Sequence, residues 1–387
     1  MSAEPSTIAS PAALEHLRWS LTAEVGPILF GRIIEHFGSV QGALGAGVQT
    51  LQAIDGIGPV LAERMARSRE TADVEAELAL AEQHGVRIIC REDDDFPRLL
   101  RHIPDPPICL YVRGRLADDD WLSVAVVGAR RCTIYGREQA QRFGQQLAAR
   151  GVVVVSGLAR GIDGESHKGA HLGGGRTLAV LGNGLATIYP PEHRELAARI
   201  TENGALISEL PMATSPSKEN FLPRNRLIAG LSLGVLVVEA ARRSGSLSTA
   251  ARASEYNREV FAIPGRVDSE FSAGTNALIR DQHAKLVTGV DDILDELGEA
   301  GELIRKETAA ADGELGGEPV PARLNLSADE QAVHAVLSRE EQSIELIAEA
   351  AGKPAAKVAS TLITLQLKGL VRQLPGGQFV KAGNYGK

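Results

Sequence analysis

The sequence predicts an α/β fold built on a doubly wound, mostly parallel sheet. Short apolar runs alternate with helical patterns over about 200 residues of the 387-residue chain. The first run, 124–127, holds four small or β-branched apolar residues and is stopped by Gly128, as in strands buried on both faces. A helical pattern ending at Gly151 leads to a second buried run, 152–155. A strand–turn–helix–strand unit places its turn where such sheets bind ligands.

The remaining strands follow from the same kind of apolar run. Strands of the main sheet are expected at 124–127, 152–155, 177–181, 205–208, 234–239, 259–263 and 285–287, with an edge-type strand at 108–112. Glycine or serine follows many of them, and that rim is the expected ligand face. The rim positions are Gly128, Ser156, Gly157, Gly182, Ser208 and Gly265.

The turn after the first strand is not a dinucleotide site. Only Gly128 of the G-x-G-x-x-G spacing is present, and Arg130 and Thr133 stand where the later glycines belong. The second strand ends in Ser156-Gly157, so no acidic residue is placed for a ribose hydroxyl. This turn suits a phosphate held by the Arg130 side chain as well as by backbone N–H groups.

The N-terminal part is expected to be helical. Residues 1–12 are expected to be a polar, disordered start, and residues 13–85 a helical domain that precedes a core at 86–298. Within that domain 25–33 and 57–65 repeat one pattern, which resembles a helix-hairpin-helix (SAM-like) segment that holds a DNA phosphate at a helix start. The alternative is a plain αα-hairpin, and the surrounding basic residues are diluted by acidic ones.

A linker and a second domain are expected after the core. Residues 299–324 are rich in Ala, Gly, Glu and Pro, which predicts a flexible, solvated linker. Residues 325–383 contain three helical patterns and a hairpin around 375–377, which together predict a winged helix. The third helix offers few donors for reading the major groove, so a protein-contact role and duplex binding stay equally open.

Composition sets limits on function. The 49 acidic residues outnumber the 41 basic ones, so a nucleic-acid site has to be a local basic patch. Three cysteines without C-x-x-C spacing predict reduced thiols in a cytoplasm and no zinc cage. His167 and His171 lie four apart, but no third ligand at a fixed offset supports a metal site. The absence of a signal sequence and of a long apolar run predicts a soluble cytoplasmic protein.

Three further clusters are candidates for anion binding. Ser156 and Gly157 with Arg160 surround a strand end and a helix start, a geometry that favours a backbone nest for a phosphate. Ser244, Gly245 and Ser246 follow a later strand and favour a phosphate at a helix start, with helix capping by Ser248 or Thr249 as the alternative.

The third of these clusters combines cations with an aromatic ring. Its members are Lys218, Phe221, Arg224, Asn225 and Arg226, at a predicted helix start. Cations for a backbone and a ring for a base are what a single-strand groove needs. The alternative is that the ring packs in the core and the arginines form ion pairs.

Taken together, these motifs resemble the DNA-processing protein A family (DprA, also called Smf). The resemblance covers about 124–287 and includes Val-Val-Gly-Ala-Arg at 126–130, Ser-Gly-Leu-Ala-Arg-Gly-Ile-Asp at 156–163 and Arg-Asn-Arg at 224–226. It implies an extended Rossmann fold, a homodimer formed through that domain, binding of single-stranded DNA, and loading of the RecA recombinase in natural transformation. Arg130 then matches the family's phosphate-gripping arginine. Leu222 stands where the family usually has proline.

The hypothesis from the sequence is therefore a DNA-binding recombination mediator without enzymatic activity, cofactor or metal. No residue pattern supplies a nucleophile with a paired base, or a Walker A loop. The alternative is a Rossmann-type nucleotide monophosphate hydrolase, because 244–255 partly matches the glycine-rich motif of such enzymes. Ala240 to Arg243 stand where that motif has its first Pro-Gly-Gly. A third interpretation is an interaction scaffold that acts through the winged domain.

Overall fold

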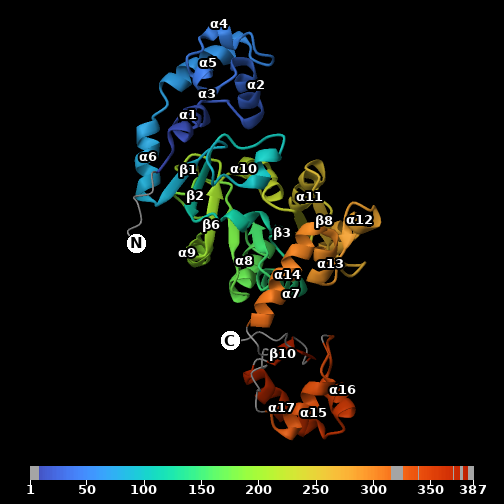
Figure 1. Ribbon diagram of the computed structural model, residues 1–387. Coiled ribbons are helices and arrows are strands. Elements are labelled where there is room, and N and C mark those ends of the chain that lie inside the picture. Colours follow the sequence, from blue (N-terminus) through green and yellow to red (C-terminus); the bar gives the residue numbers. More distant parts are fainter. Residues whose placement is uncertain (1–7, 315–325, 339, 369, 375–377, 382–387) are drawn as a thin grey trace. The chain divides into compact units, whose positions relative to one another are not determined.

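The structure is a computed structural model that describes residues 8–314, 326–338, 340–368, 370–374 and 378–381. The chain divides into two compact units, with the division after Glu314 (Figure 1). The first unit contains the N-terminal helices and a large sheet, and the second contains three helices and a hairpin. Among the described helices, none combines the length and the apolar composition that crossing a bilayer requires.

A nine-stranded sheet forms the centre of the first unit, and it is mostly parallel, as predicted. Its spatial order is β1-β2-β6-β5-β4-β3-β7-β8-β9. The strands are β1 (Val86–Ile89), β2 (Leu110–Gly114), β3 (Ser123–Val127), β4 (Val153–Ser156), β5 (Thr177–Val180), β6 (Gly204–Ser208), β7 (Gly234–Val237), β8 (Glu259–Ala262) and β9 (Lys285–Leu286). β3 to β9 pair in parallel, whereas β2 is antiparallel to both β1 and β6.

Strand β2 is not the edge strand that the sequence predicted. The run 86–90 forms β1, which pairs with β2 and takes the edge position itself. Val86, Ile88 and Ile89 are buried, so β1 is anchored by side-chain packing as well as by the backbone ladder.

Two helical layers cover the sheet, as a doubly wound fold requires. Ala125 and Val127 of β3 pack in one apolar cluster with α10 (Lys218–Gly230) and α11 (Ser246–Glu255). Val124 and Val126 point to the opposite face and pack with α7 (Ile134–Ala148) and α8 (Ile162–Leu172). The alternation along β3 explains why its sequence is apolar at every position. Further helices of this unit are α9 (Arg194–Glu202), α12 (Ala273–Arg280) and α13 (Val290–Glu296).

The order of the strands places a crevice beside β3. The chain runs from β3 outward through β4, β5 and β6, and then crosses back so that β7 pairs with the other side of β3. The loops after β3 and β7 therefore lead to opposite faces of the sheet. Open α/β sheets bind ligands at this switch point, outside the carboxyl ends of the strands.

The N-terminal helices contact the sheet through the first and the last of them, which both meet β1. The first begins at Pro11, inside the stretch 1–12 that the sequence predicted to be disordered. These helices are α1 (Pro11–Ser20), α2 (Pro27–Phe37), α3 (Val40–Leu44), α4 (Val48–Leu51), α5 (Pro59–Glu70) and α6 (Val74–Gln83). Both copies of the sequence repeat begin a helix at the proline that follows a glycine, Pro27 and Pro59. One apolar cluster joins Trp19 and Met65 of these helices to Tyr111 of β2 and Leu206 of β6. Residues 13–85 are thus part of the first compact unit.

The predicted flexible linker is wrong for its first part. Residues Glu299–Glu314 form helix α14, and Ile304 is buried in the same cluster as Ile293 and Leu294 of α13. Alanine and glutamate are strong helix formers, so a composition poor in large apolar residues still yields a helix once one face is anchored. Residues 315–324 lie outside the described part.

The second unit has the secondary structure of a winged helix. Helices α15 (Ala328–Val336), α16 (Ile344–Ala351) and α17 (Ala355–Leu367) precede the antiparallel hairpin of β10 (Val371–Leu374) and β11 (Gln378–Lys381). This unit has its own apolar core, which includes Val333, Ile347, Leu362 and Phe379.

Candidate nucleic-acid interface

A cavity of about 300 Å³ lies at the switch point beside β3. Four segments line it: the loop after β3, the stretch from the loop after β4 into α8, the first turns of α10, and the loop that leads from β7 into α11. The structure therefore brings together residues from three of the predicted clusters. The predicted residues that line this cavity are Gly128, Arg130, Lys218, Phe221, Arg224, Asn225, Ser244, Gly245 and Ser246.

A second, smaller hollow adjoins the first and shares Arg130, Ala159 and Phe221 with it. Its lining includes the loop after β4, where Gly157 and Arg160 lie. Arg160 is exposed and donates to the Glu192 carboxylate, which keeps this guanidinium at the rim. The two hollows form one surface that passes from the β7 loop to the β4 loop, and three of the six predicted rim positions, Gly128, Gly157 and Gly182, line it.

The loop that carries Arg130 is fixed by Glu239 at the end of β7. The Glu239 carbonyl oxygen accepts from the Ala129 N–H at 2.8 Å. Its carboxylate accepts from the Thr133 N–H at 2.9 Å and from the Thr133 hydroxyl at 2.6 Å. These bonds hold both ends of the turn that the Arg130 side chain leaves.

Arg130 and Lys218 supply the available positive charge of the cavity. Within the part of the chain that the structure describes, neither side chain has a carboxylate partner. Lys218 is the first residue of α10, whose N-cap is Ser217 with its side chain accepting from the Glu219 N–H. A helix start adds partial positive charge to that of the lysine itself.

Phe221 points into the same cavity despite the leucine that follows it. The Arg130 guanidinium carbon lies 4.6 Å from the centroid of the Phe221 ring, a cation–π distance. The Tyr189 ring lies 6.0 Å away at an interplanar angle of 32°. Leu222 lines the cavity as well and is 57% exposed, and Pro223 lies inside α10. The shift of the proline therefore leaves the ring at the site.

Arg224 is a buried arginine that organises the ends of two strands. Its Nη1 donates to the Gly157 carbonyl at 2.9 Å and also to the Val180 carbonyl. Burial lowers the pKa of its guanidinium to about 10, while the nearby Asp163 carboxylate acts in the opposite direction. A Cβ on Gly157 would lie 2.6 Å from both the Arg224 and the Asp163 side chains, so glycine is required there. Arg224 shapes the cavity but has little freedom to grip a ligand.

Asn225 and the serines connect α10 to the start of α11. The Asn225 side-chain amide donates to the Ser248 hydroxyl at 3.0 Å and to the Gly245 carbonyl at 3.3 Å. The Ser244 and Ser246 hydroxyls lie 2.8 Å apart, and α11 has no side-chain N-cap bond. The first N–H groups of α11 already have partners in this loop, because the Ser246 N–H donates to the Ser244 hydroxyl at 3.4 Å and the Leu247 N–H to the Ser244 carbonyl at 3.2 Å.

Two predicted site residues do not reach the cavity. Ser156 is fully buried, and its hydroxyl donates to the Val126 carbonyl at 2.6 Å, which ties β4 to β3. Arg226 is buried on the other side of α10, where it donates to the Asp105 carbonyl at 2.7 Å and to the Glu209 carboxylate. Arg226 is thus a structural ion-pair partner, the alternative that the sequence left open.

Sequence reasoning missed three residues that shape the site. Asp163 lines the cavity beside Arg224, and burial raises the pKa of its carboxyl against the opposing effect of that arginine. Tyr189 lies against Phe221, and Glu239 holds the Arg130 loop. A signal existed for Glu239, because it follows β7 at the carboxyl edge. Its partner Thr133 could not be identified without the pairing of β7 with β3.

The two histidines of α8 differ in their surroundings. His167 is buried with its Nδ1 2.7 Å from the Thr177 hydroxyl, whereas His171 is exposed on the same helix. In the second unit, Lys357 and Lys368 of the α17 region pair with Asp329 and Glu330. These ion pairs occupy two of the few cations that this region offers to a duplex.

Comparison with known proteins agrees with this architecture. Residues 87–298 match the family described as "DNA recombination-mediator protein A", and residues 317–377 match the "DprA winged helix domain". Protein Smf of Escherichia coli (strain K12) is 40% identical over 312 residues, which cover 79% of this chain and 80% of that protein. Protein Smf of Synechocystis is 38% identical over 286 residues, which cover 73% of this chain and 72% of that protein.

A solved structure shows the same fold. The X-ray structure of DNA processing protein A (DprA) from Streptococcus pneumoniae superposes with a TM-score of 0.63 at 34% identity. The match covers 74% of this chain and 98% of that chain. Since the family match spans nearly the whole nine-stranded sheet and extends to relatives over most of their length, this chain belongs to the DNA recombination-mediator protein A family, the DprA or Smf proteins.

Proposed function

We propose that the chain is a mediator of DNA recombination that binds single-stranded DNA in the cavity beside β3, without sequence preference and without enzymatic activity. The observation that carries the proposal is the convergence of Arg130, Lys218 and the Phe221 ring in one cavity. Two cations without carboxylate partners suit consecutive phosphates, and a ring in the same cavity suits a base. A flexible single strand can bend its bases toward such a ring, whereas a duplex keeps them stacked inside.

The composition of the site also explains the expected lack of sequence preference. Every base has a π-face, so stacking on Phe221 tolerates all four bases. Phosphate contacts position a strand but do not read its sequence. Because the chain as a whole carries a net charge of −8, binding depends on the local charge of this cavity and falls steeply as salt is added.

The first test replaces the two cations in the full-length chain. Arg130→Ala and Lys218→Ala are each compared with wild type by fluorescence anisotropy on labelled oligonucleotides of several sequences over a range of salt concentrations. Each variant should bind every sequence more weakly, and the slope of log affinity against log salt should decrease by ~0.7 for each phosphate that the variant no longer neutralises. The matched control is Arg280→Ala, because Arg280 is an exposed arginine of α12 that pairs with Asp281. Unchanged affinity and slope in both cavity variants would refute the proposed site.

A second variant separates stacking from charge. Phe221→Leu keeps an apolar side chain against Gly182 but removes the ring, and it should cost about 1–3 kcal/mol of binding, roughly 5- to 150-fold. The salt slope should stay close to that of wild type, because the variant neutralises the same phosphates. Since Arg130 lies on the Phe221 ring, the double variant should lose less than the sum of the two single losses.

The alternative function is that of a nucleotide monophosphate hydrolase, and the residues of the cavity allow a test of it. Among the described residues that line the cavity, Asp163 supplies the carboxylate, and Arg224 lies beside it as a charge partner. A nucleotide monophosphate hydrolase would need such a carboxylate to act on the substrate. Incubation of the chain with nucleoside monophosphates should release no free base. Release that is lost in Asp163→Asn would establish the hydrolase instead.

We also propose that the chain works in the cytoplasm as a homodimer paired through the sheet unit, and that it delivers bound DNA to the RecA recombinase during natural transformation. This part is supported by membership in a family described as recombination mediators. RecA filament formation on single-stranded DNA covered by single-strand binding protein should become faster when the chain is added. Arg130→Ala should lose this effect in parallel with its loss of DNA affinity.

A further inference from the structure

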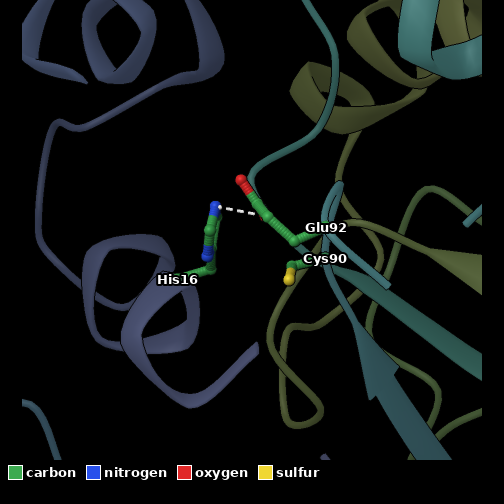
Figure 2. A group of neighbouring side chains, drawn as sticks. All are labelled: His16, Cys90 and Glu92. Atoms are coloured by element: carbon green, nitrogen blue, oxygen red, sulfur yellow. Dashed lines mark ion pairs between the residues drawn. The ribbon is translucent and has the colours of Figure 1, made fainter. Parts of the chain in front are cut away.

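We propose that His16, Cys90 and Glu92 form a binding site for a transition-metal ion, with Zn²⁺ as the preferred ion. The His16 imidazole nitrogen, the Cys90 sulfur and a Glu92 carboxylate oxygen all lie within 4.8 Å of one another. Figure 2 shows the three side chains converging from helix α1 and from the loop that follows β1. The site lies in the first unit, uses none of the residues of the DNA cavity, and has a role independent of it.

The hydrogen bond of His16 leaves its other nitrogen ready to bind a cation. Nδ1 lies 2.9 Å from the Ala12 carbonyl oxygen one turn earlier in α1, so this nitrogen carries the hydrogen and donates. In the neutral ring Nε2 then has a lone pair, and it faces a Glu92 carboxylate oxygen at 3.1 Å. Two lone pairs at that distance repel unless a cation lies with them, and the cation is a second proton or a metal ion. Metal-bound histidines usually have their other nitrogen fixed by a carbonyl or carboxylate in this way.

The Cys90 thiol makes a metal ion the better of these two cations. Cys90 is buried, and its backbone N–H donates to the Asp93 carboxylate at 2.7 Å, which fixes the loop after β1. A proton between His16 and Glu92 bridges only those two groups, whereas a metal ion can bind all three donor atoms. A set of one nitrogen, one sulfur and one oxygen is typical of zinc and unsuited to Mg²⁺ or Ca²⁺, which take oxygen ligands.

The geometry needs only a small adjustment to close around the ion. Donor atoms of a tetrahedral zinc site lie roughly 3.3–3.6 Å apart, given zinc–ligand bonds of about 2.0–2.3 Å. The His16–Glu92 distance is 3.1 Å, and the widest separation in the group stays within 4.8 Å. Glu92 is 53% exposed and can move, whereas His16 and Cys90 are held by packing. Its exposure also leaves room for a water molecule as the fourth ligand.

A bound ion would join two parts of the fold. His16 belongs to the N-terminal helices, whereas Cys90 and Glu92 directly follow the edge strand β1. These residues lie far apart in the sequence, and their ligation adds a link that the unfolded chain lacks. Binding of Zn²⁺ should therefore stabilise the packing of α1 against the sheet.

The test uses Zn²⁺ and Co²⁺ with the full-length chain after treatment with a chelator and dialysis. Wild type should take up one equivalent of Zn²⁺, and its Tm should rise on addition of the ion. Co²⁺ should give the near-ultraviolet charge-transfer band of a thiolate–cobalt bond. His16→Gln, Cys90→Ser and Glu92→Gln should each weaken binding at least about tenfold, and Cys90→Ser should also lose the charge-transfer band.

Matched controls distinguish loss of a ligand from loss of the fold. His36→Gln changes an exposed histidine of α2, and Cys109→Ser changes a second buried cysteine close to the site. Both should keep the metal stoichiometry, and Cys109→Ser should keep the cobalt band. Circular dichroism without metal should be the same for all variants. The proposal fails if folded wild type takes up less than one equivalent, or if Cys90→Ser retains the cobalt band; His16 and Glu92 would then be a simple ion pair.

Discussion

His167 on α8 is a histidine that the folded chain holds without charge. Its Nδ1 lies 2.7 Å from the Thr177 hydroxyl, which itself donates to the Val154 carbonyl at 2.6 Å, so Nδ1 carries the hydrogen. Nε2 is buried and has no hydrogen-bond partner in the described chain. Burial, with smaller effects from His193 and Arg224, lowers the pKa of the imidazole to about 3.

The stability of the first unit should therefore fall in mild acid because of His167. The unfolded chain gains a proton at this residue below pH 6.5, whereas the folded chain gains it only near pH 3. Between these values the unfolded state binds one more proton, so the free energy of unfolding should decrease by about 1.4 kcal/mol per pH unit from this residue alone. Above pH 6.5 the residue makes no pH-dependent contribution.

Urea unfolding of wild type and His167→Gln between pH 4 and pH 7 measures this effect. Glutamine does not titrate, so the pH slope of the variant should be shallower than that of wild type by the amount given, whatever its stability at pH 7. His171→Gln is the control, because His171 is exposed on the same helix. Equal slopes in His167→Gln and wild type would show that folding does not lower the pKa of His167.

The arginines of α10 show how much can be predicted from sequence about the roles of single residues. The sequence placed Arg224, Asn225 and Arg226 together at a helix start, and they do lie in one helix. Which of them faces the cavity depends on the phase of the helix. Which is neutralised depends on distant carboxylates: Arg226 meets Glu209 and Asp105. Those partners follow only from the tertiary fold, so the sequence could not separate the structural arginines from Arg130.

At the scale of elements, the crossing of the loops after β3 and β4 is the tightest part of the site. Gly161 precedes α8 with φ +76° and ψ −128°, a conformation that is accessible essentially only to glycine. A Cβ here would meet the Ala129 carbonyl oxygen and would lie 2.7 Å from the Arg130 carbonyl oxygen. Leu158 in the same loop also has a positive φ, 55°. The position of Arg130 thus depends on the absence of a side chain at residue 161.

Gly161→Ala should weaken DNA binding through this close approach, although residue 161 need not touch DNA. The added carbon has to push the Arg130 backbone away, which displaces the guanidinium from Phe221 and also lowers the Tm. Gly174→Ala is the matched control, because Gly174 has φ +70° but open space around its Cβ position. The control should cost about 1 kcal/mol of stability and no DNA affinity. Anisotropy and thermal unfolding measure both effects, and equal DNA affinity in the two variants would contradict this role of the loop crossing.

Helices and strands could be predicted where a local sequence pattern alone determines the secondary structure. Runs such as 124–127 gave the parallel strands because a strand buried on both faces must be apolar throughout. The place of β2 was not predictable, because only its pairing with β1 shows that it is internal. Helix α14 was not predicted, because its stability comes from the packing of Ile304 against α13. The composition of 299–314 does not show that contact.

At the scale of the whole molecule, the boundaries that matter are those of the apolar clusters. One cluster continues from the N-terminal helices into the sheet through Trp19, Met65, Tyr111 and Leu206. Another continues from the sheet into α14 through Ile304. The change of composition at residues 86 and 299 therefore marks a change of secondary structure, whereas the compact unit ends after Glu314.

These clusters predict how fragments of the chain behave. The fragment 1–314 should unfold in one cooperative transition and keep the DNA affinity of the sheet unit, because both clusters are complete. The fragment 1–298 loses the burial of Ile304 and uncovers part of α13, which should cost at least about 1.5–3 kcal/mol. The fragment 86–314 uncovers Tyr111 and Leu206 together with the rest of that face, and it should be the least stable of the three.

Urea unfolding of the three fragments is followed by far-ultraviolet circular dichroism. Tryptophan fluorescence would not compare them on equal terms, because 86–314 lacks Trp19. The expected order of stability is 1–314, then 1–298, then 86–314, because one buried side chain is removed in the second fragment and a whole layer in the third. If 86–314 were as stable as 1–314, the N-terminal helices would be an independent domain. Their shared cluster with β2 and β6 would then contribute nothing to folding, and a zinc ion at His16 and Cys90 would have no packing to reinforce.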